Sequence, residues 1–150
     1  MATHEYWGNG DGWDFKILAT DISTEVLKKA RQGVYSRQEV LKAPPHLVQS
    51  YFSWTGDRHN PLYAVHNEIK QMVVFRRLNL LEQTYPFTGL FDLIMCRNVM
   101  IYFDQETKEA ILKRFYRCMH KGASLFTGHS ESLSGYEHYF KRVKAAVYRK

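Results

Sequence analysis

The sequence predicts an α/β fold, because short apolar strands alternate with amphipathic helices along the chain. Residues 15–20 form a mostly apolar run that ends at Asp21, and apolar side chains at helical spacing follow it. The same order recurs where the apolar run at 91–96 precedes a helical pattern that begins after Asp104. Strands and helices that alternate at these lengths favour parallel strands joined by right-handed crossovers.

The first predicted helix has signals at both ends. Ser23 or Thr24 can accept hydrogen bonds from its first amide groups, and Gly33 suits the left-handed residue that ends a helix. Its apolar residues fall on one side: Ile22, Val26, Leu27 and Ala30. Residues 34–77 are less regular, and we interpret them as including a small antiparallel β-subdomain, with a further strand at 72–78.

The last third of the chain predicts one long helix and three more strands. Asp104 can cap the helix, which we expect to reach Lys121–Gly122. Its apolar face comprises five residues: Ile111, Leu112, Phe115, Cys118 and Met119. Residues 124–128 predict a strand, and 139–143 and 145–148 predict two strands that pair with each other.

Composition places the chain among globular proteins. Its 150 residues suit one domain, and 45% hydrophobic with 24% charged residues excludes disorder as the main state. No apolar run is long enough to span a membrane and no signal peptide is visible, so a cytoplasmic protein is expected. Cys96 and Cys118 are expected to be free thiols, and the net charge of +6 is compatible with an acidic protein surface or a nucleic acid.

Ligands of parallel α/β sheets bind beyond the carboxyl ends of the strands, so the residues that follow each predicted strand are candidates for a site. These are Asp21, Asn79, Arg97, Asn98 and the segment 128–131. An ionised aspartate can accept hydrogen bonds from both hydroxyls of a ribose, but Asp21 can equally cap the helix after it.

The other candidates also have two interpretations. The Asn79 amide can match the edge of an adenine while Leu80 packs on the ring, or Asn79 is an ordinary turn residue. Arg97 can hold a substrate carboxylate in its fork of donors, or pair with a surface acid. The adjacent residues His129–Glu131 cannot form a nucleophilic triad among themselves, because their side chains diverge, so a hydrolase is disfavoured.

Four segments together are similar to one known family. They are Thr20–Arg31, Phe75 with Asn79–Leu81, Phe91–Asp92 with Cys96–Phe103, and Gly128–Glu131. The octet Cys-Arg-Asn-Val-Met-Ile-Tyr-Phe, in order with the other three segments at matching spacings, is the most specific. Over roughly residues 14–149 the chain resembles the catalytic domain of the CheR chemotaxis receptor methyltransferases.

The resemblance implies a truncated Rossmann-like sheet of a SAM-dependent methyltransferase with a small antiparallel β-subdomain within 34–77. In some family members that subdomain docks on a tethering peptide of the receptor. The implied activity is O-methylation of glutamate side chains on the cytoplasmic domains of chemoreceptors. The implied cofactor is S-adenosyl-L-methionine, which becomes S-adenosyl-L-homocysteine, and no metal is implied.

The resemblance also implies roles for individual residues. The residue matching Asp21 binds the ribose of the cofactor, and those matching Asn79–Leu80 contact the adenine. Arg97–Asn98 match a pair at the cofactor pocket, and the family's counterparts of Arg97 and Tyr102 face the transfer site. We expect Arg97 to orient the incoming carboxylate and Tyr102 to line the transfer path. A glutamate is already an anion at neutral pH, so positioning in a dry pocket suffices.

One part of the family's pattern is missing. The family's catalytic domain starts with a strand, a loop of the form G-x-S-x-G-E-E-P-Y-S and a helix, whereas Gly8–Gly12 does not match that loop. We therefore interpret residues 1–14 as a polar lead and 15–150 as a partial catalytic domain. Because this loop is absent, weak or no binding of the cofactor is expected. The two strands that flank the missing strand either pair directly with each other or are covered by a second copy of the chain, and a homodimer is favoured.

Two other functions stay open. The chain can be a noncatalytic fragment of the same family that keeps the receptor-docking surface. A nucleic-acid-binding domain is disfavoured, because the aromatic residues lie mostly in core-type patterns and form no basic and aromatic track. We therefore expect no nucleic-acid partner and no insertion into membranes.

Overall fold

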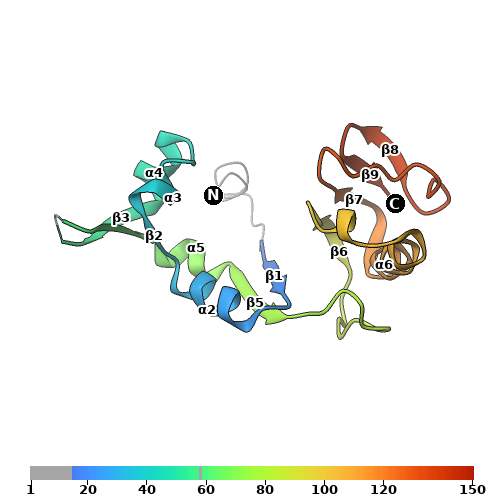
Figure 1. The fold of residues 1–150 in the computed structure, drawn as a ribbon, viewed down its shortest axis with the longest axis horizontal. Coiled ribbons are helices and arrows are strands. Elements are labelled where there is room, and N and C mark those ends of the chain that lie inside the picture. Colours follow the sequence, from blue (N-terminus) through green and yellow to red (C-terminus); the bar gives the residue numbers. More distant parts are fainter. Residues whose placement is uncertain (1–14, 58) are drawn as a thin grey trace. The chain divides into compact units, whose positions relative to one another are not determined.

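The structure is a computed structural model that describes residues 15–57 and 59–150. The chain forms two compact units, Met1–Asn79 and Leu80–Lys150, and each is described by itself (Figure 1). The predicted polar lead, residues 1–14, lies outside the described residues. None of the helices in the described ranges has the length and apolar character that crossing a membrane requires.

The first unit is built on a parallel pair of strands. β1 (Ile17–Asp21) pairs with β5 (Val73–Arg77) from Ile17 opposite Val73 to Asp21 opposite Arg77. The Leu78 N–H donates to the Asp21 carbonyl oxygen at 3.1 Å, which extends the ladder by one residue. Strands were predicted at both places, and their parallel pairing confirms the α/β class for this unit.

The helix α2 (Thr24–Gln32) begins and ends where its signals predict. Ser23 is the N-cap, because its Oγ accepts from the Val26 N–H at 3.3 Å. Gly33 has φ of 58° and donates its N–H to the Ala30 carbonyl. The predicted apolar side is only partly buried: Leu27 is buried, whereas Ile22 and Val26 are 56% and 53% exposed.

The β-subdomain of the first unit is a three-stranded antiparallel sheet, which confirms the predicted pairing type. Its order is β2 (Val34–Ser36), β4 (Pro61–Val65) and β3 (Phe52–Gly56). Three short helices that the sequence did not predict accompany this sheet: α3 (Arg37–Val40), α4 (Pro45–Tyr51) and α5 (Asn67–Gln71).

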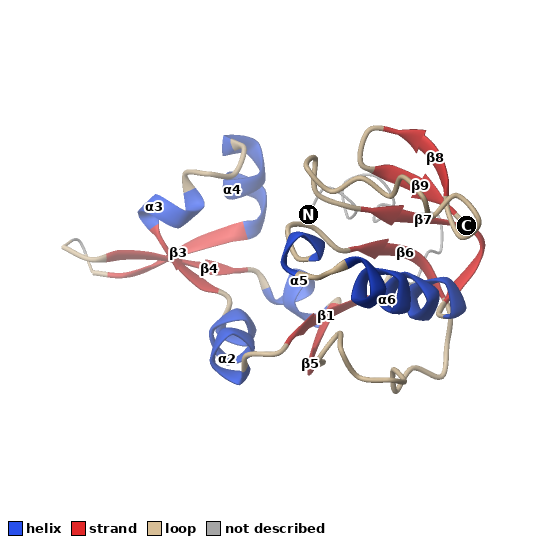
Figure 2. Ribbon diagram, turned by 45° about the vertical axis from the view of Figure 1, so that its right-hand side comes forward, coloured by secondary structure: helices blue, strands red, loops and turns tan. Residues whose placement is uncertain are grey.

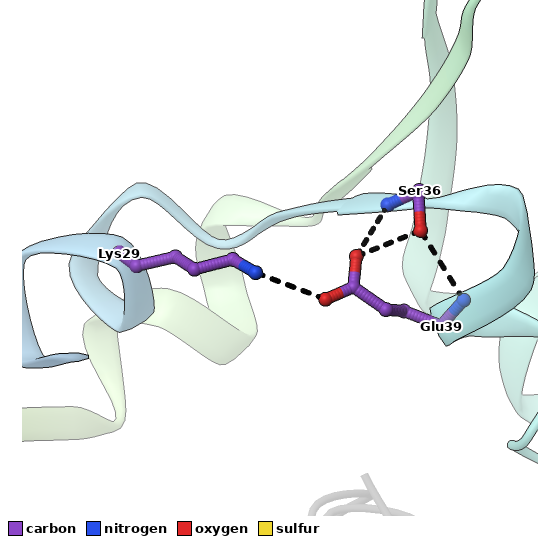
Figure 3. Close-up of polar contacts among 3 residues, drawn as sticks. All are labelled: Lys29, Ser36 and Glu39. Atoms are coloured by element: carbon purple, nitrogen blue, oxygen red, sulfur yellow. Dashed lines mark hydrogen bonds and ion pairs between the residues drawn. The ribbon is translucent and has the colours of Figure 1, made fainter.

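A charged contact joins α2 to the start of α3 (Figure 3). The Glu39 carboxylate accepts from the Ser36 N–H and Oγ, both at 2.8 Å, and from Lys29 Nζ at 3.0 Å. The Glu39 N–H in turn donates to Ser36 Oγ at 3.4 Å, so the two residues form a reciprocal cap. The Ser36 backbone hydrogen bond, followed by Lys29 and the Ser36 hydroxyl, lowers the pKa of Glu39 to about 2.

The second unit is a four-stranded sheet with one long helix. The sheet order is β6 (Phe91–Met95), β7 (Met119–Phe126), β9 (Val147–Arg149) and β8 (Lys141–Lys144). β6 and β7 are parallel, and the other two pairings are antiparallel. Figure 2 shows α6 (Gln105–Arg117), which connects β6 to β7, running beside this sheet. The parallel pair and the paired C-terminal strands confirm the prediction.

The end of α6 differs from the prediction. Asp104 caps the helix as expected, since its Oδ1 accepts from the Thr107 N–H at 2.8 Å. The helix ends at Arg117, however, and Met119 already begins β7, where it pairs with Phe91. Met119 continues the helical spacing of apolar residues, so a prediction from periodicity alone placed the end of the helix too late in the sequence.

The core of the second unit lies between α6 and the sheet. Its fully buried members come from the helix, from β7 and from the segment before β8: Ile111, Leu112, Met119, Leu125 and Phe140. Tyr148 of β9 is also buried, and its hydroxyl accepts from the Leu133 N–H at 3.2 Å. Cys96 and Cys118 are free thiols, as predicted.

The low pKa of Glu39 gives a test of the contact between α2 and α3. Because the folded value lies below the usual 4.5, the carboxylate stabilises the fold above about pH 4.5, and this contribution is lost as the pH falls through about 2. We expect Lys29→Met to raise the pKa while leaving it below 4.5, because the larger Ser36 hydrogen bond remains. Carboxyl ¹³C NMR titration measures it, with Lys28→Met as the control, and a wild-type midpoint at 4.5 contradicts the contact.

Candidate functional site

Asp21 and Asn79 lie at the same end of the parallel pair of the first unit. β1 ends at Asp21, and β5 ends directly opposite it at Arg77. The hydrogen bond from Leu78 to Asp21 continues the ladder, and Asn79 is the next residue along the chain. The carboxyl ends of the two strands therefore carry both predicted residues.

The Asp21 carboxylate has a local partner. The Ser23 N–H donates to Asp21 Oδ1 at 2.8 Å, which holds the turn between β1 and α2. Ser23 rather than Asp21 caps the helix. Among the described residues no group donates to Oδ2, so the half-buried carboxylate keeps an acceptor for a ligand hydroxyl.

The second unit also brings two strand ends together. The Cys96 N–H donates to the Phe126 carbonyl at 2.8 Å, so β6 and β7 stay paired up to their carboxyl ends. Arg97 and Asn98 follow β6, and both are exposed. Asn98 has φ of 59°, a left-handed conformation that asparagine tolerates better than most residues.

Glu131 joins the loop after β6 to the loop after β7. It is only 5% exposed, and each carboxylate oxygen accepts two backbone N–H groups. Oε2 accepts from Asn98 at 2.8 Å and from Gly128 at 2.5 Å, and Oε1 accepts from Val99 at 2.8 Å and from Met100 at 2.7 Å. We call this arrangement of Glu131 with the four amides the carboxylate clamp.

The clamp leaves no room for a side chain at residue 128. A Cβ on Gly128 would lie 2.5 Å from Asn98 Oδ1 and 2.6 Å from Glu131 Oε2. The Thr127 hydroxyl donates to the Glu131 carbonyl at 2.9 Å and closes the same loop. The glycine is therefore required by the close approach of these two side chains.

The surroundings of the clamp set the protonation states of two buried side chains, Glu131 and Cys96. Burial raises the pKa of Glu131, but the four backbone hydrogen bonds together outweigh burial, so the pKa lies below its usual value and the side chain is ionised at neutral pH. Burial, with a smaller effect of the Glu131 charge, raises the pKa of the Cys96 thiol to about 12. Cys96 is therefore a protonated thiol and not a nucleophile.

The remaining predicted residues belong to the second unit. Tyr102 ends the short 3₁₀ helix η1 (Met100–Tyr102) and is 80% exposed, while Met100 is buried in the core. Leu80 packs partly buried against that core, and its carbonyl accepts from the Tyr85 hydroxyl and from Arg114 Nη1, each at 3.0 Å.

Sequence reasoning missed the role of Glu131. It selected Glu131 within the segment 128–131 that follows a strand, but the only role it considered for the side chain was in a triad with the exposed His129 and Ser130, whereas the Glu131 carboxylate is occupied by backbone amides. The available signal was an acidic residue three positions after Gly128, the glycine that ends the strand predicted at 124–128. A carboxylate in that place can bind the amides of a neighbouring loop.

The low pKa of Glu131 predicts how acid affects the second unit. The clamp contributes stability above about pH 4.5 that is lost as the pH falls through the lowered folded pKa. We expect Glu131→Gln to lower the free energy of unfolding at pH 7 by about 1–3 kcal/mol and to flatten its decline towards pH 3. Urea denaturation measures both, with the exposed Glu109→Gln as the control, and equal acid slopes in wild type and Glu131→Gln contradict the clamp.

Comparison with known proteins identifies related chains. The family described as "CheR methyltransferase, SAM binding domain" matches residues 1–149. The chemotaxis protein methyltransferase of Escherichia coli is 44% identical over 134 residues, which cover 89% of this chain and 47% of that protein. The corresponding protein of Borreliella burgdorferi is 39% identical over 151 residues, which cover 100% of this chain and 52% of that protein.

The chain thus spans about half the length of the curated relatives it matches. Among solved structures, the N-methyltransferase NodS from Bradyrhizobium japonicum in complex with S-adenosyl-L-homocysteine has a TM-score of 0.44 at 12% identity, over 75% of this chain and 40% of that one. The match over residues 1–149 shows that the chain belongs to the CheR methyltransferase family and corresponds to its SAM-binding domain.

Proposed function

We propose that this chain is part of a SAM-dependent enzyme that methylates glutamate side chains on the cytoplasmic domains of chemoreceptors. The observation that carries the proposal is the family match over almost the whole chain. Relatives named chemotaxis protein methyltransferase support the same activity. The proposal also assigns the chain to the cytoplasm, where such receptor domains are accessible. A homodimer stays a prediction, and light scattering that shows a monomer at high micromolar concentration rejects it.

The polar and apolar groups of the proposed cofactor-binding residues suit S-adenosyl-L-methionine. Asp21 offers an acceptor oxygen for the ribose hydroxyls, and Asn79 offers both a donor and an acceptor for the adenine edge. Leu80 supplies an apolar contact for the ring, and Asn98 and Arg97 of the second unit are the further residues that we assign to cofactor binding. When bound, S-adenosyl-L-methionine would supply a methyl group to a carboxylate oxygen, and its sulfur would keep the electrons of the broken S–C bond as the neutral thioether of S-adenosyl-L-homocysteine.

Arg97 and Tyr102 are the proposed catalytic residues. The Arg97 guanidinium carries its charge at any physiological pH and presents two parallel donors, which suits it to orient a glutamate carboxylate. Tyr102 lines the path between this carboxylate and the methyl group and excludes water. A glutamate is an anion at neutral pH, so the transfer requires no general base from the chain.

Replacement of Asp21 tests the ribose contact. Asp21→Asn keeps an oxygen for the Ser23 N–H but removes the negative acceptor, so we expect the affinity for S-adenosyl-L-homocysteine to fall about 10-fold. Calorimetric titration measures this and extends to millimolar ligand, because weak binding is expected. Asp57→Asn is the matched control, since Asp57 also accepts from nearby backbone amides in a loop of the same unit. Equal affinities of wild type and Asp21→Asn refute the assignment.

Replacement of Arg97 separates catalysis from cofactor binding. We expect Arg97→Ala to reduce turnover about 100-fold, because the acceptor is no longer oriented, and to change the affinity for S-adenosyl-L-homocysteine much less. Transfer of a radiolabelled methyl group to receptor-enriched membranes and calorimetry provide the two measurements. Arg142→Ala removes an exposed arginine elsewhere in the same unit and serves as the control. Equal losses of turnover and affinity speak against this role.

A further inference from the structure

The loop after β6 is held chiefly through its backbone. The amides of the three consecutive residues 98–100 all point at the Glu131 carboxylate. Asn98 is left-handed and Val99 right-handed, a combination that turns successive N–H groups toward one concave site for an anion. Glu131 reaches this site from 31 to 33 residues further along the chain.

The carboxylate is fully used in this position. Each oxygen accepts two N–H groups, and Oε2 is shared between Asn98 of one loop and Gly128 of the other. A glutamine at residue 131 retains only one acceptor oxygen and directs an NH₂ group at two backbone donors. An amide therefore cannot replace the carboxylate without releasing one pair of these contacts.

Arg97 is the residue directly before this anchored turn. Its side chain is exposed, and within residues 15–57 and 59–150 no group accepts a hydrogen bond from its guanidinium. The backbone to which it is attached therefore fixes the position of its Cα and the direction of its Cα–Cβ bond, and with them the region that the guanidinium can reach. That backbone is held on both sides of Arg97: the Cys96 N–H before it donates to the Phe126 carbonyl, and the Asn98 N–H after it donates to Glu131.

We propose that Glu131 is a positioning residue for methyl transfer, which fixes the loop 97–100 so that Arg97 presents its guanidinium to the acceptor carboxylate. This inference rests on the proposed function, because it assigns Glu131 an effect through Arg97. It differs from a role in folding alone, in which loss of Glu131 lowers stability without a specific link to Arg97.

NMR tests the contacts of Glu131, first in the wild-type chain and then in a variant. Scalar couplings through the hydrogen bonds are expected between the Glu131 side-chain carboxyl carbon and the amide nitrogens of Asn98, Val99 and Met100. In Glu131→Gln we expect hydrogen exchange of these amides to speed up at least about 10-fold. Glu137→Gln is the matched control, because Glu137 also accepts a backbone N–H in the second unit, from Gly135, and is exposed. Absence of the couplings in the wild type overturns the inference.

A double-mutant cycle then tests whether Glu131 acts through Arg97. We expect Glu131→Gln to lower the rate of methyl transfer to receptor-enriched membranes about 100-fold, and the double variant with Arg97→Ala to lose no more than Arg97→Ala alone. Losses that multiply in the double variant overturn the inference while the proposed function stands. A wild-type chain that transfers no methyl group even at millimolar S-adenosyl-L-methionine overturns the proposed function and the inference together.

Discussion

The second unit depends on one contact: the buried Glu131 carboxylate accepts hydrogen bonds from four backbone amides. This contact organises the ends of the strands β6 and β7. β6 and β7 are adjacent in the sheet, but α6 and its connections separate their carboxyl ends in the sequence. One ionised side chain bridges this separation and satisfies a buried amide, that of Met100. Because burial of the charge is offset by several donors at once, loss of any single donor leaves the carboxylate less well compensated.

The predictable part of the fold is the part set by local chemistry. Ser23, Gly33 and Asp104 act as caps in the structure because each bonds within one helical turn of itself. The end of α6 depends instead on the pairing of Met119 with Phe91, a contact between distant residues that apolar spacing does not encode. The short helices of the β-subdomain were missed for a related reason, since each has too few residues to show a period.

The candidate site also has a part that the sequence predicts and a part that it does not. Parallel strands present their carboxyl ends at one edge, so the sequence could select Asp21, Asn79, Arg97, Asn98 and the segment 128–131 as residues that follow strands, but not their division between two sheets. The left-handed backbone of Asn98 and the close approach of Gly128 to it arise only after β6 and β7 have paired. Residues whose role is to hold other residues are therefore harder to recognise in a sequence than residues that touch a ligand.

β8 forms one margin of the four-stranded sheet and pairs, within the described residues, with β9. Three of its four side chains are cations, and all are exposed: Lys141, Arg142 and Lys144. Like charges along an open strand repel an identical strand that approaches it, which is a common protection of natural sheets against aggregation. The composition of β8 therefore disfavours polymers in which copies of this chain pair edge to edge through that strand.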